Sequence, residues 1–203
     1  MTIWFLARAT GLVALMAFSA ATALGALSSR RVVGTGSAPP DARRLDRRLL
    51  MQLAHRSAAV LALAMLLAHA SLIIADAYVD VSISATLLPF TAGYRPLALG
   101  LGTLAAYAFV VVAVSGAMRG RLANSARAVR RWRRVHLLAY VGWGLSMGHG
   151  VFAGTDTGSW WSTAIYATCG LAVAVALILR LRSDRAHRLT PLPAARTLAK
   201  STS

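Results

Sequence analysis

Residues 49–75 read LLMQLAHRSAAVLALAMLLAHASLIIA, an apolar run that contains two histidines, His55 and His69. A run of about 20 apolar residues matches the roughly 30 Å hydrocarbon thickness of a bilayer. An ionisable side chain inside such a run is costly and therefore indicates a functional site. This stretch predicts a membrane-spanning helix that carries a pair of functional histidines.

Apolar runs of similar length occur at four other places in the chain. We expect spans over residues 3–27, 96–118 and 134–152, and a last one from about Trp160 to Arg180 or Arg182. Of the 203 residues, 57% are hydrophobic and 14% are charged, whereas a soluble domain of this size needs more polar surface. The sequence therefore predicts an all-α integral membrane protein. Residues 1–182 would form one bundle of five transmembrane helices, and residues 183–203 a basic, disordered tail.

The distribution of charge predicts the topology. The chain has 22 basic and 6 acidic residues, with a single lysine and no glutamate. The arginines fall in alternate loops, as the positive-inside rule requires, rather than in one patch typical of a nucleic-acid-binding protein. We therefore expect a multi-pass plasma-membrane protein with its N-terminus outside and its C-terminus in the cytoplasm. Membrane lipids are expected partners, and nucleic acid is not.

Three further features bear on the organisation of the chain. The first run resembles a signal peptide, but its arginines follow the apolar segment instead of preceding it, which favours a retained span. The outer loop over residues 76–94 is apolar enough to predict a segment that packs over the outer mouth of the bundle. No internal repeat at a fixed period is apparent.

Two residues with potential metal chemistry fit simpler roles. The single cysteine, Cys169, lies in an apolar run, where a small packing residue is expected. His187 lies among arginines in the predicted tail and is interpreted as a solvated side chain.

The four remaining histidines form two pairs with nearly equal spacing. His55 and His69 are 14 residues apart, and His136 and His149 are 13 apart, which places each pair roughly 20 Å apart along its helix. The two helices run in the same direction because a single return span separates them. His55 and His136 would then share the cytoplasmic level, and His69 and His149 the outer level. Two such levels suit two b-type haems, stacked across the bilayer with histidine on both axial faces.

Helical rotation tests this arrangement. At about 100° per residue, 14 residues return to within about 40° of the starting face, whereas 13 residues end about 140° away. The second histidine helix must therefore overwind or kink, and Gly142 and Gly144 are candidate positions. Zinc or di-iron sites fit poorly because only two imidazoles meet at each level. The alternative for all four histidines is a purely structural role, as interhelical hydrogen-bonding groups.

The pattern resembles the ferric reductase-like transmembrane superfamily, which includes NADPH oxidases and bacterial haem-binding reductase subunits. His55-x13-His69 and His136-x12-His149 match the signature of that superfamily, two histidine pairs on two helices. The segment Trp132-Arg-Arg-Val-His136-Leu-Leu-Ala-Tyr140 and the pair His149-Gly150 are similar to its bacterial members. The resemblance covers residues 4–182 and implies two haem b groups and a bacterial source.

The resemblance also suggests haem-propionate contacts. Leu6-Ala7-Arg8-Ala9 is similar to a segment in which an arginine approaches the outer haem, so Arg8 is a candidate, with contact to lipid headgroups as the alternative. Arg95 is a second outer candidate. Arg56, beside His55, is an inner candidate, for which headgroup contact is favoured.

Two departures from the family change the expected function. Members often have six spans, whereas five are predicted here. Reductases of the family also carry a cytoplasmic flavin and nicotinamide domain, and no Gly-rich dinucleotide motif follows the last span. FAD and NAD(P)H are therefore not expected to bind this chain.

We expect electron transfer from a separate donor to an outer-face acceptor. The donor would be a flavoprotein, a ferredoxin-like protein or a quinol. The alternatives are a haem-binding membrane anchor that reduces a dedicated extracytoplasmic enzyme, such as a methionine sulfoxide reductase, and a non-redox membrane scaffold.

Overall fold

The computed structural model describes residues 2–28, 42–76, 81–122 and 124–189. Over these residues the chain is helical and contains no β-strand; the helices are α1 (Thr2–Ser28), α2 (Ala42–Ala75), α3 (Ile83–Leu87), α4 (Pro96–Ala117), α5 (Arg119–Leu122), α6 (Ala126–His136), α7 (Leu138–Ala153) and α8 (Trp160–Leu189). The all-α prediction is confirmed.

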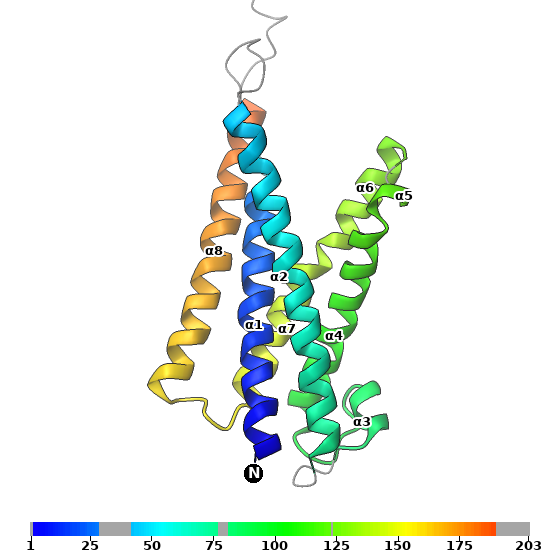
Figure 1. The fold of residues 1–203 in the computed structure, drawn as a ribbon, viewed down its shortest axis with the longest axis vertical. Helices are drawn as coiled ribbons and strands as arrows, with labels where there is room; N and C mark the ends of the chain where they lie inside the picture. The colour runs from blue at the N-terminus through cyan, green and yellow to red at the C-terminus, as the bar shows by residue number, and fades with distance from the viewer. Residues whose placement is uncertain (1, 29–41, 77–80, 123, 190–203) are drawn as a thin grey trace, which may run out of the picture.

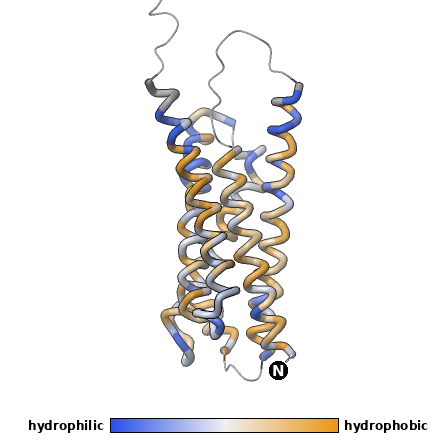
Figure 2. The backbone as a smooth tube through the Cα atoms, turned by 90° about the vertical axis from the view of Figure 1, so that its left-hand side faces the viewer, coloured by the Kyte–Doolittle hydropathy of each residue, from blue (hydrophilic) through white to orange (hydrophobic). Residues whose placement is uncertain are grey.

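Four of these helices are long and apolar enough to cross a membrane. They cover Thr2–Ser28, Leu45–Ala75, Pro96–Ala117 and Trp160–Arg185. Figure 2 shows mostly hydrophobic residues along these helices, with hydrophilic residues gathered toward the ends of the molecule. These properties are those of a multi-pass membrane protein.

The long helices form two antiparallel hairpins. In Figure 1, α2 runs beside α1, and α7 runs beside α4. The N-terminal helix α1 also contacts α7 and α8, so it lies between the hairpin of α4 and α7 on one side and the last helix on the other. The histidine-bearing helices α2 and α7 thus each lie against a neighbour that carries no histidine.

The predicted span over residues 134–152 is not one continuous helix. It is divided at Leu137, where α6 ends at His136 and α7 begins at Leu138. At this break the amide of Leu137 donates to the carbonyls of Arg133 and Arg134, and the amide of Tyr140 donates to the carbonyl of Leu137. The i→i+3 bonds are those of a tightened, 3₁₀-like turn. The distortion expected in this span therefore exists, but at Leu137 instead of Gly142 or Gly144, which lie inside α7.

Other predicted boundaries were wrong by several residues. The second span was predicted to begin at Leu49, but α2 begins at Ala42, so residues 42–48 are helical and not part of a loop. The last helix continues beyond residue 182 to Leu189, into the predicted tail. Residues 29–41 and 190–203, and the side chain of His187, lie outside the described residues.

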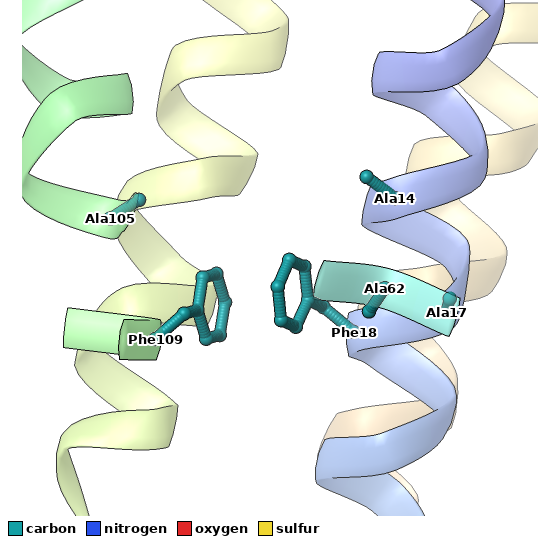
Figure 3. Close-up of a cluster of buried hydrophobic side chains, with 6 residues drawn as sticks. All are labelled: Ala14, Ala17, Phe18, Ala62, Ala105 and Phe109. Carbon is teal, nitrogen blue, oxygen red and sulfur yellow. The ribbon is translucent and has the colours of Figure 1, made fainter. Parts of the chain in front are cut away.

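The core lies where the two hairpins meet. Phe18 on α1 stacks on Phe109 on α4, with ring centroids 3.6 Å apart and an angle of 5° between the planes. Figure 3 shows the two rings facing each other between the helices, with small alanines around them. Nearby, Trp143 on α7 donates its Nε1–H to Ser19 Oγ at 2.9 Å. These contacts join both hairpins at mid-length.

Residues 81–95, which precede α4, pack against the bundle, as their apolar composition predicts. Val81, Ala85 and Ala92 form a small buried cluster, and Tyr107 on α4 donates its hydroxyl to the carbonyl of Leu87. Phe90 has a φ of 68° and packs its ring directly against Gly100. A left-handed conformation is costly for an aromatic residue, so the close approach to Gly100 holds this turn in place.

Candidate functional site

The four membrane histidines meet in the two predicted pairs. The ring centres of His55 and His136 are 6.3 Å apart, with 60° between the ring planes. The ring centres of His69 and His149 are 6.2 Å apart, at 76°. All four side chains are half-buried. The 14-residue separation on α2 places the two pairs roughly 20 Å apart along the bundle.

These separations suit one metal ion between each pair. With metal–nitrogen bonds of about 2.0–2.1 Å and roughly 1.1 Å from the bonded nitrogen to its ring centre, opposed imidazoles on one ion have centres about 6.2–6.4 Å apart. Both observed distances fall in or close to this range. Within the described part of the chain, no group of three or more histidine, cysteine or acidic side chains forms a candidate metal site. Each pair can therefore supply two opposite ligands.

In the His69–His149 pair, both rings are oriented by backbone carbonyls of the neighbouring helix. His69 Nδ1 lies 2.7 Å from the carbonyl oxygen of Ala7, and His149 Nδ1 lies 2.8 Å from that of Ala98. A carbonyl can only accept, so Nδ1 carries the proton in both rings. Nε2 is then left with its lone pair, which is the form of histidine that binds a metal.

The His55–His136 pair is less symmetric. His55 Nδ1 lies 2.9 Å from the carbonyl oxygen of Ala21, in the same arrangement as the other pair. His136 Nδ1 is buried and has no hydrogen-bond partner among the described residues. Its ring instead stacks on Trp132, with centroids 4.9 Å apart. Trp132 in turn donates its Nε1–H to the carbonyl of Ser115 at 3.0 Å.

Glycines allow the rings to approach the neighbouring helices. A Cβ atom added at Gly11 would lie 2.9 Å from the His69 ring, and one at Gly102 would lie 2.7 Å from His149 Nδ1. At Gly25 the nearest atom would be His55 Cε1, at 3.2 Å. Contacts below about 3.0 Å require a neighbour to move. The imidazole rings therefore pack against α1 and α4 at positions without a side chain. We call each of these glycine positions, with its neighbouring carbonyl, a cradle.

The two cradle helices have the same pattern of residues, offset by 91 positions. On α1, Ala7, whose carbonyl accepts from His69, precedes Gly11 by four residues, and Phe18 follows Gly11 by seven. On α4, Ala98, Gly102 and Phe109 have the same spacing, with His149 as the donor. The matching positions are Ala7/Ala98, Gly11/Gly102, Ala14/Ala105, Ala17/Ala108, Phe18/Phe109, Ala21/Val112 and Gly25/Gly116. The two cradle helices thus repeat the same residues, whereas His136 follows His55 by 81 positions and His149 follows His69 by 80. No repeat at one fixed period therefore extends over both hairpins.

The fourth cradle is where the repeat is imperfect. By analogy with Ala21, the carbonyl of Val112 should accept from His136, but it accepts from Ser115 Oγ at 2.8 Å. A Cβ at Gly116 would lie 3.7 Å from His136 Cε1, an ordinary contact. The cause is the spacing: the histidines are 14 residues apart on α2, but 13 apart across the break at Leu137. The shorter spacing moves the His136 ring out of its cradle.

The arginine candidates lie in three different surroundings. Arg8 forms an ion pair with Asp156 in the turn between α7 and α8. Arg95 donates to the carbonyls of Phe152 and Ala153, at 3.0 and 3.3 Å, and so caps the C-terminus of α7. Arg56 is exposed. Both outer candidates thus have protein partners at the end of the bundle nearest His69 and His149.

Sequence reasoning missed the glycines and Trp132. The glycines carry a detectable signal, because Gly11 and Gly25, like Gly102 and Gly116, have the 14-residue spacing of His55 and His69. Trp132 was named above only as part of the segment that is similar to bacterial members of the superfamily, with no role assigned to its side chain. Cys169 is buried in α8, where a packing residue was expected.

Comparison with known proteins adds no relative to this picture: no protein-family model, curated protein or solved structure matches the chain.

Proposed function

We propose that this protein conducts electrons across a membrane through two b-type haems. One haem would be held by His55 and His136, and the other by His69 and His149. The observation that carries the proposal is the separation of the ring centres, 6.3 Å in one pair and 6.2 Å in the other. Four histidines that only bonded between helices would have no reason to share this spacing.

The donor set suits iron in a porphyrin. His55 with His136, and His69 with His149, would each hold one haem iron through imidazole nitrogens. Haem held in this way would supply one-electron redox chemistry.

The protein residues would hold and orient the ligands. The carbonyls of Ala7, Ala21 and Ala98 fix the proton on Nδ1 of three rings, so that Nε2 faces the metal. The glycine cradles let these rings sit close to α1 and α4 without distorting the helices. Because each pair takes one histidine from each hairpin, a haem bound there would join the hairpins.

The stacked rings of Phe18 and Phe109 support a conduit. Phe18 follows Gly11 by seven residues and precedes Gly25 by seven, and Phe109 is placed in the same way between Gly102 and Gly116. The pair therefore lies midway between the two histidine levels, in a dry core. This position would exclude water between the redox centres and preserve their spacing.

The direction of transfer is inferred from charge and from the resemblance to ferric reductase-like membrane domains. The arginine-rich ends of α2, α6 and α8 would face the cytoplasm, which places His55 and His136 on the donor side. A flavoprotein, a ferredoxin-like protein or a quinol would deliver electrons there. The acceptor would meet the opposite end, near Arg8, Arg95 and the apolar segment before α4.

The non-redox scaffold explains part of the same geometry. The bonds from Nδ1 to backbone carbonyls are interhelical hydrogen bonds, which such a scaffold would need. A scaffold does not require the ring centres to lie 6.2 or 6.3 Å apart in both pairs. The haem proposal accounts for this spacing as well as for the hydrogen bonds.

The test is haem content, measured by pyridine haemochrome assay on protein from haem-replete cells. Wild type should contain two b-type haems per chain. His55→Ala and His136→Ala should each remove the same haem, and His69→Ala and His149→Ala the other. His187→Ala is the control and should keep both.

A colourless wild-type protein would contradict the proposal. So would histidine variants that all retain wild-type spectra. The conduit itself is tested in sealed vesicles that enclose ferricyanide, with reductant added outside. Trapped ferricyanide should be reduced with wild type and not with a variant that lacks either haem.

A further inference from the structure

Helix α6 presents four arginines on one face. Arg127, Arg130, Arg131 and Arg134 follow the i, i+3, i+4, i+7 spacing of a single helical stripe, and all four are exposed. They line a cavity of about 200 Å³. The opposite face, which includes Val129 and Trp132, is half-buried. We call these four residues the arginine stripe.

The arginine stripe forms no ion pair within the described part of the chain. The ion pair between Arg8 and Asp156 lies at the other end of the bundle. The first turn of α6 contains no acidic residue. Arg127, in the first turn of α6, is opposed by the helix dipole unless an anion is bound, whereas Arg134 lies in the last turn, where the dipole favours a cation.

Exposed apolar side chains follow the arginine stripe directly in the chain. Leu137, at the break between the helices, is 47% exposed. Leu138 and Val141, one turn apart at the start of α7, are 37% and 54% exposed. The cationic end of α6 is therefore followed by an exposed apolar stretch at the start of α7.

From this juxtaposition we propose that the arginine stripe is a binding site for one anionic phospholipid. Guanidinium groups bind phosphate oxygens in a bidentate manner, and four of them surround a cavity large enough for a phosphodiester headgroup. The acyl chain would lie along Leu138 and Val141. A free phosphate would use the arginines alone, so the apolar continuation favours the lipid.

The site is next to one of the histidine pairs but does not depend on a bound metal. His136 ends the same helix, and Trp132 stacks on it from the half-buried face. A lipid on the arginine stripe would fix the position of α6 relative to α7, on the N-terminal side of the break at Leu137.

The experiment is native mass spectrometry of the delipidated protein, titrated in detergent with phosphatidylglycerol. The test variant carries Arg→Gln at positions 127, 130, 131 and 134. The control carries Arg→Gln at 47, 48, 182 and 185, four exposed arginines on α2 and α8. Both variants lose the same charge from the same end of the bundle.

Wild type and control should each bind one phosphatidylglycerol, and the test variant should bind it more weakly by a factor on the order of 100. Phosphatidylcholine and inorganic phosphate should bind wild type much more weakly than phosphatidylglycerol does. Leu138→Gln with Val141→Gln should weaken lipid binding while leaving the weak binding of phosphate unchanged.

Three outcomes would overturn the proposal. Equal loss in test and control variants would mean a diffuse attraction of charge. Inorganic phosphate that bound as tightly as the lipid would assign the arginine stripe to a soluble phosphate. Displacement of the lipid by an acidic peptide at equal concentration would assign it to a protein partner. If the fourfold variant fails to fold, the pair Arg130→Gln and Arg134→Gln is titrated with the same expected order.

Discussion

The indole ring of Trp132 stacks on the imidazole of His136, with ring centroids 4.9 Å apart and 28° between the planes. The guanidinium of Arg119 lies 4.9 Å from the centre of the same indole. The indole Nε1–H of Trp132 donates to the backbone carbonyl of Ser115. Of the four paired histidines, His136 alone lacks a hydrogen bond at Nδ1 within the described residues. An aromatic contact thus takes the orienting role that carbonyls have elsewhere.

Replacement of Trp132 should affect one haem. In Trp132→Ala the His136 ring loses the aromatic contact on its face. We expect the haem proposed at this ring to bind about 10- to 100-fold more weakly, as for other losses around a metal ligand. Trp132→Phe should keep the stack and bind nearly normally. Haem titration and the low-spin EPR signal of the ferric protein measure both effects. Wild-type binding and EPR in Trp132→Ala would show that the stack orients nothing.

The glycines on α4 offer a matched pair of substitutions. Gly102→Ala would place a Cβ 2.7 Å from His149 Nδ1, so the ring must move and we expect loss of one haem. Gly116→Ala would place its Cβ 3.7 Å from His136, in ordinary contact, and should retain both haems. The measurement is haem per chain by pyridine haemochrome.

The other cradle extends this ranking. Gly11→Ala should resemble Gly102→Ala, and Gly25→Ala, with a nearest contact of 3.2 Å, should be intermediate. Gly170→Ala has no atom within 4 Å of the new Cβ and serves as the control. If helix propensity alone decided the outcome, all of these substitutions would be neutral or stabilising.

Charge at the outer end should set the reduction potential of the haem at His69 and His149. Arg8→Gln removes a positive charge and so destabilises the reduced form, which lowers the potential. Asp156→Asn removes a negative charge and raises it. Each shift should be on the order of tens of millivolts, since these groups are partly exposed. Spectroelectrochemical titration should show the other haem almost unchanged; equal shifts of both haems would exclude a local effect.

The stacked phenylalanines should be coupled energetically. Phe18→Ala and Phe109→Ala each open a cavity at the hairpin junction and should lower the thermal denaturation midpoint in detergent. The double variant should lose less free energy of unfolding than the two single variants lose together, by about 0.5–1.5 kcal/mol, because either single change already breaks the stack. Strict additivity would mean that the two rings do not stabilise each other.

Much of the site was predictable because helical geometry is regular. Residue spacing alone placed His55 opposite His136 and His69 opposite His149, and the structure brings together these pairs. The same arithmetic showed that 13 residues could not serve an undistorted helix. The lengths of the apolar runs predicted the helices at residues 2–28 and 96–117 almost to the residue, because the thickness of a bilayer sets the length of a spanning helix.

The features that were missed depend on packing between helices. The break falls at Leu137, although two glycines nearby look more suitable for a kink, because the His136 end must shift relative to α4 while α7 stays packed against it. The carbonyl partners of the histidines have no side-chain signature. Gly11 and Gly102 become informative only when each is known to face a particular imidazole.

The division of the bundle into two hairpins has a consequence for assembly. Each half of the chain provides one histidine at each level, so a ligand that joins the histidines also joins the halves. Cofactor capture and docking of the hairpins are then a single linked equilibrium, in which scarcity of the ligand shifts the population toward separated hairpins. Two separately expressed halves, divided between α2 and α3, would be expected to associate more tightly when that ligand is supplied.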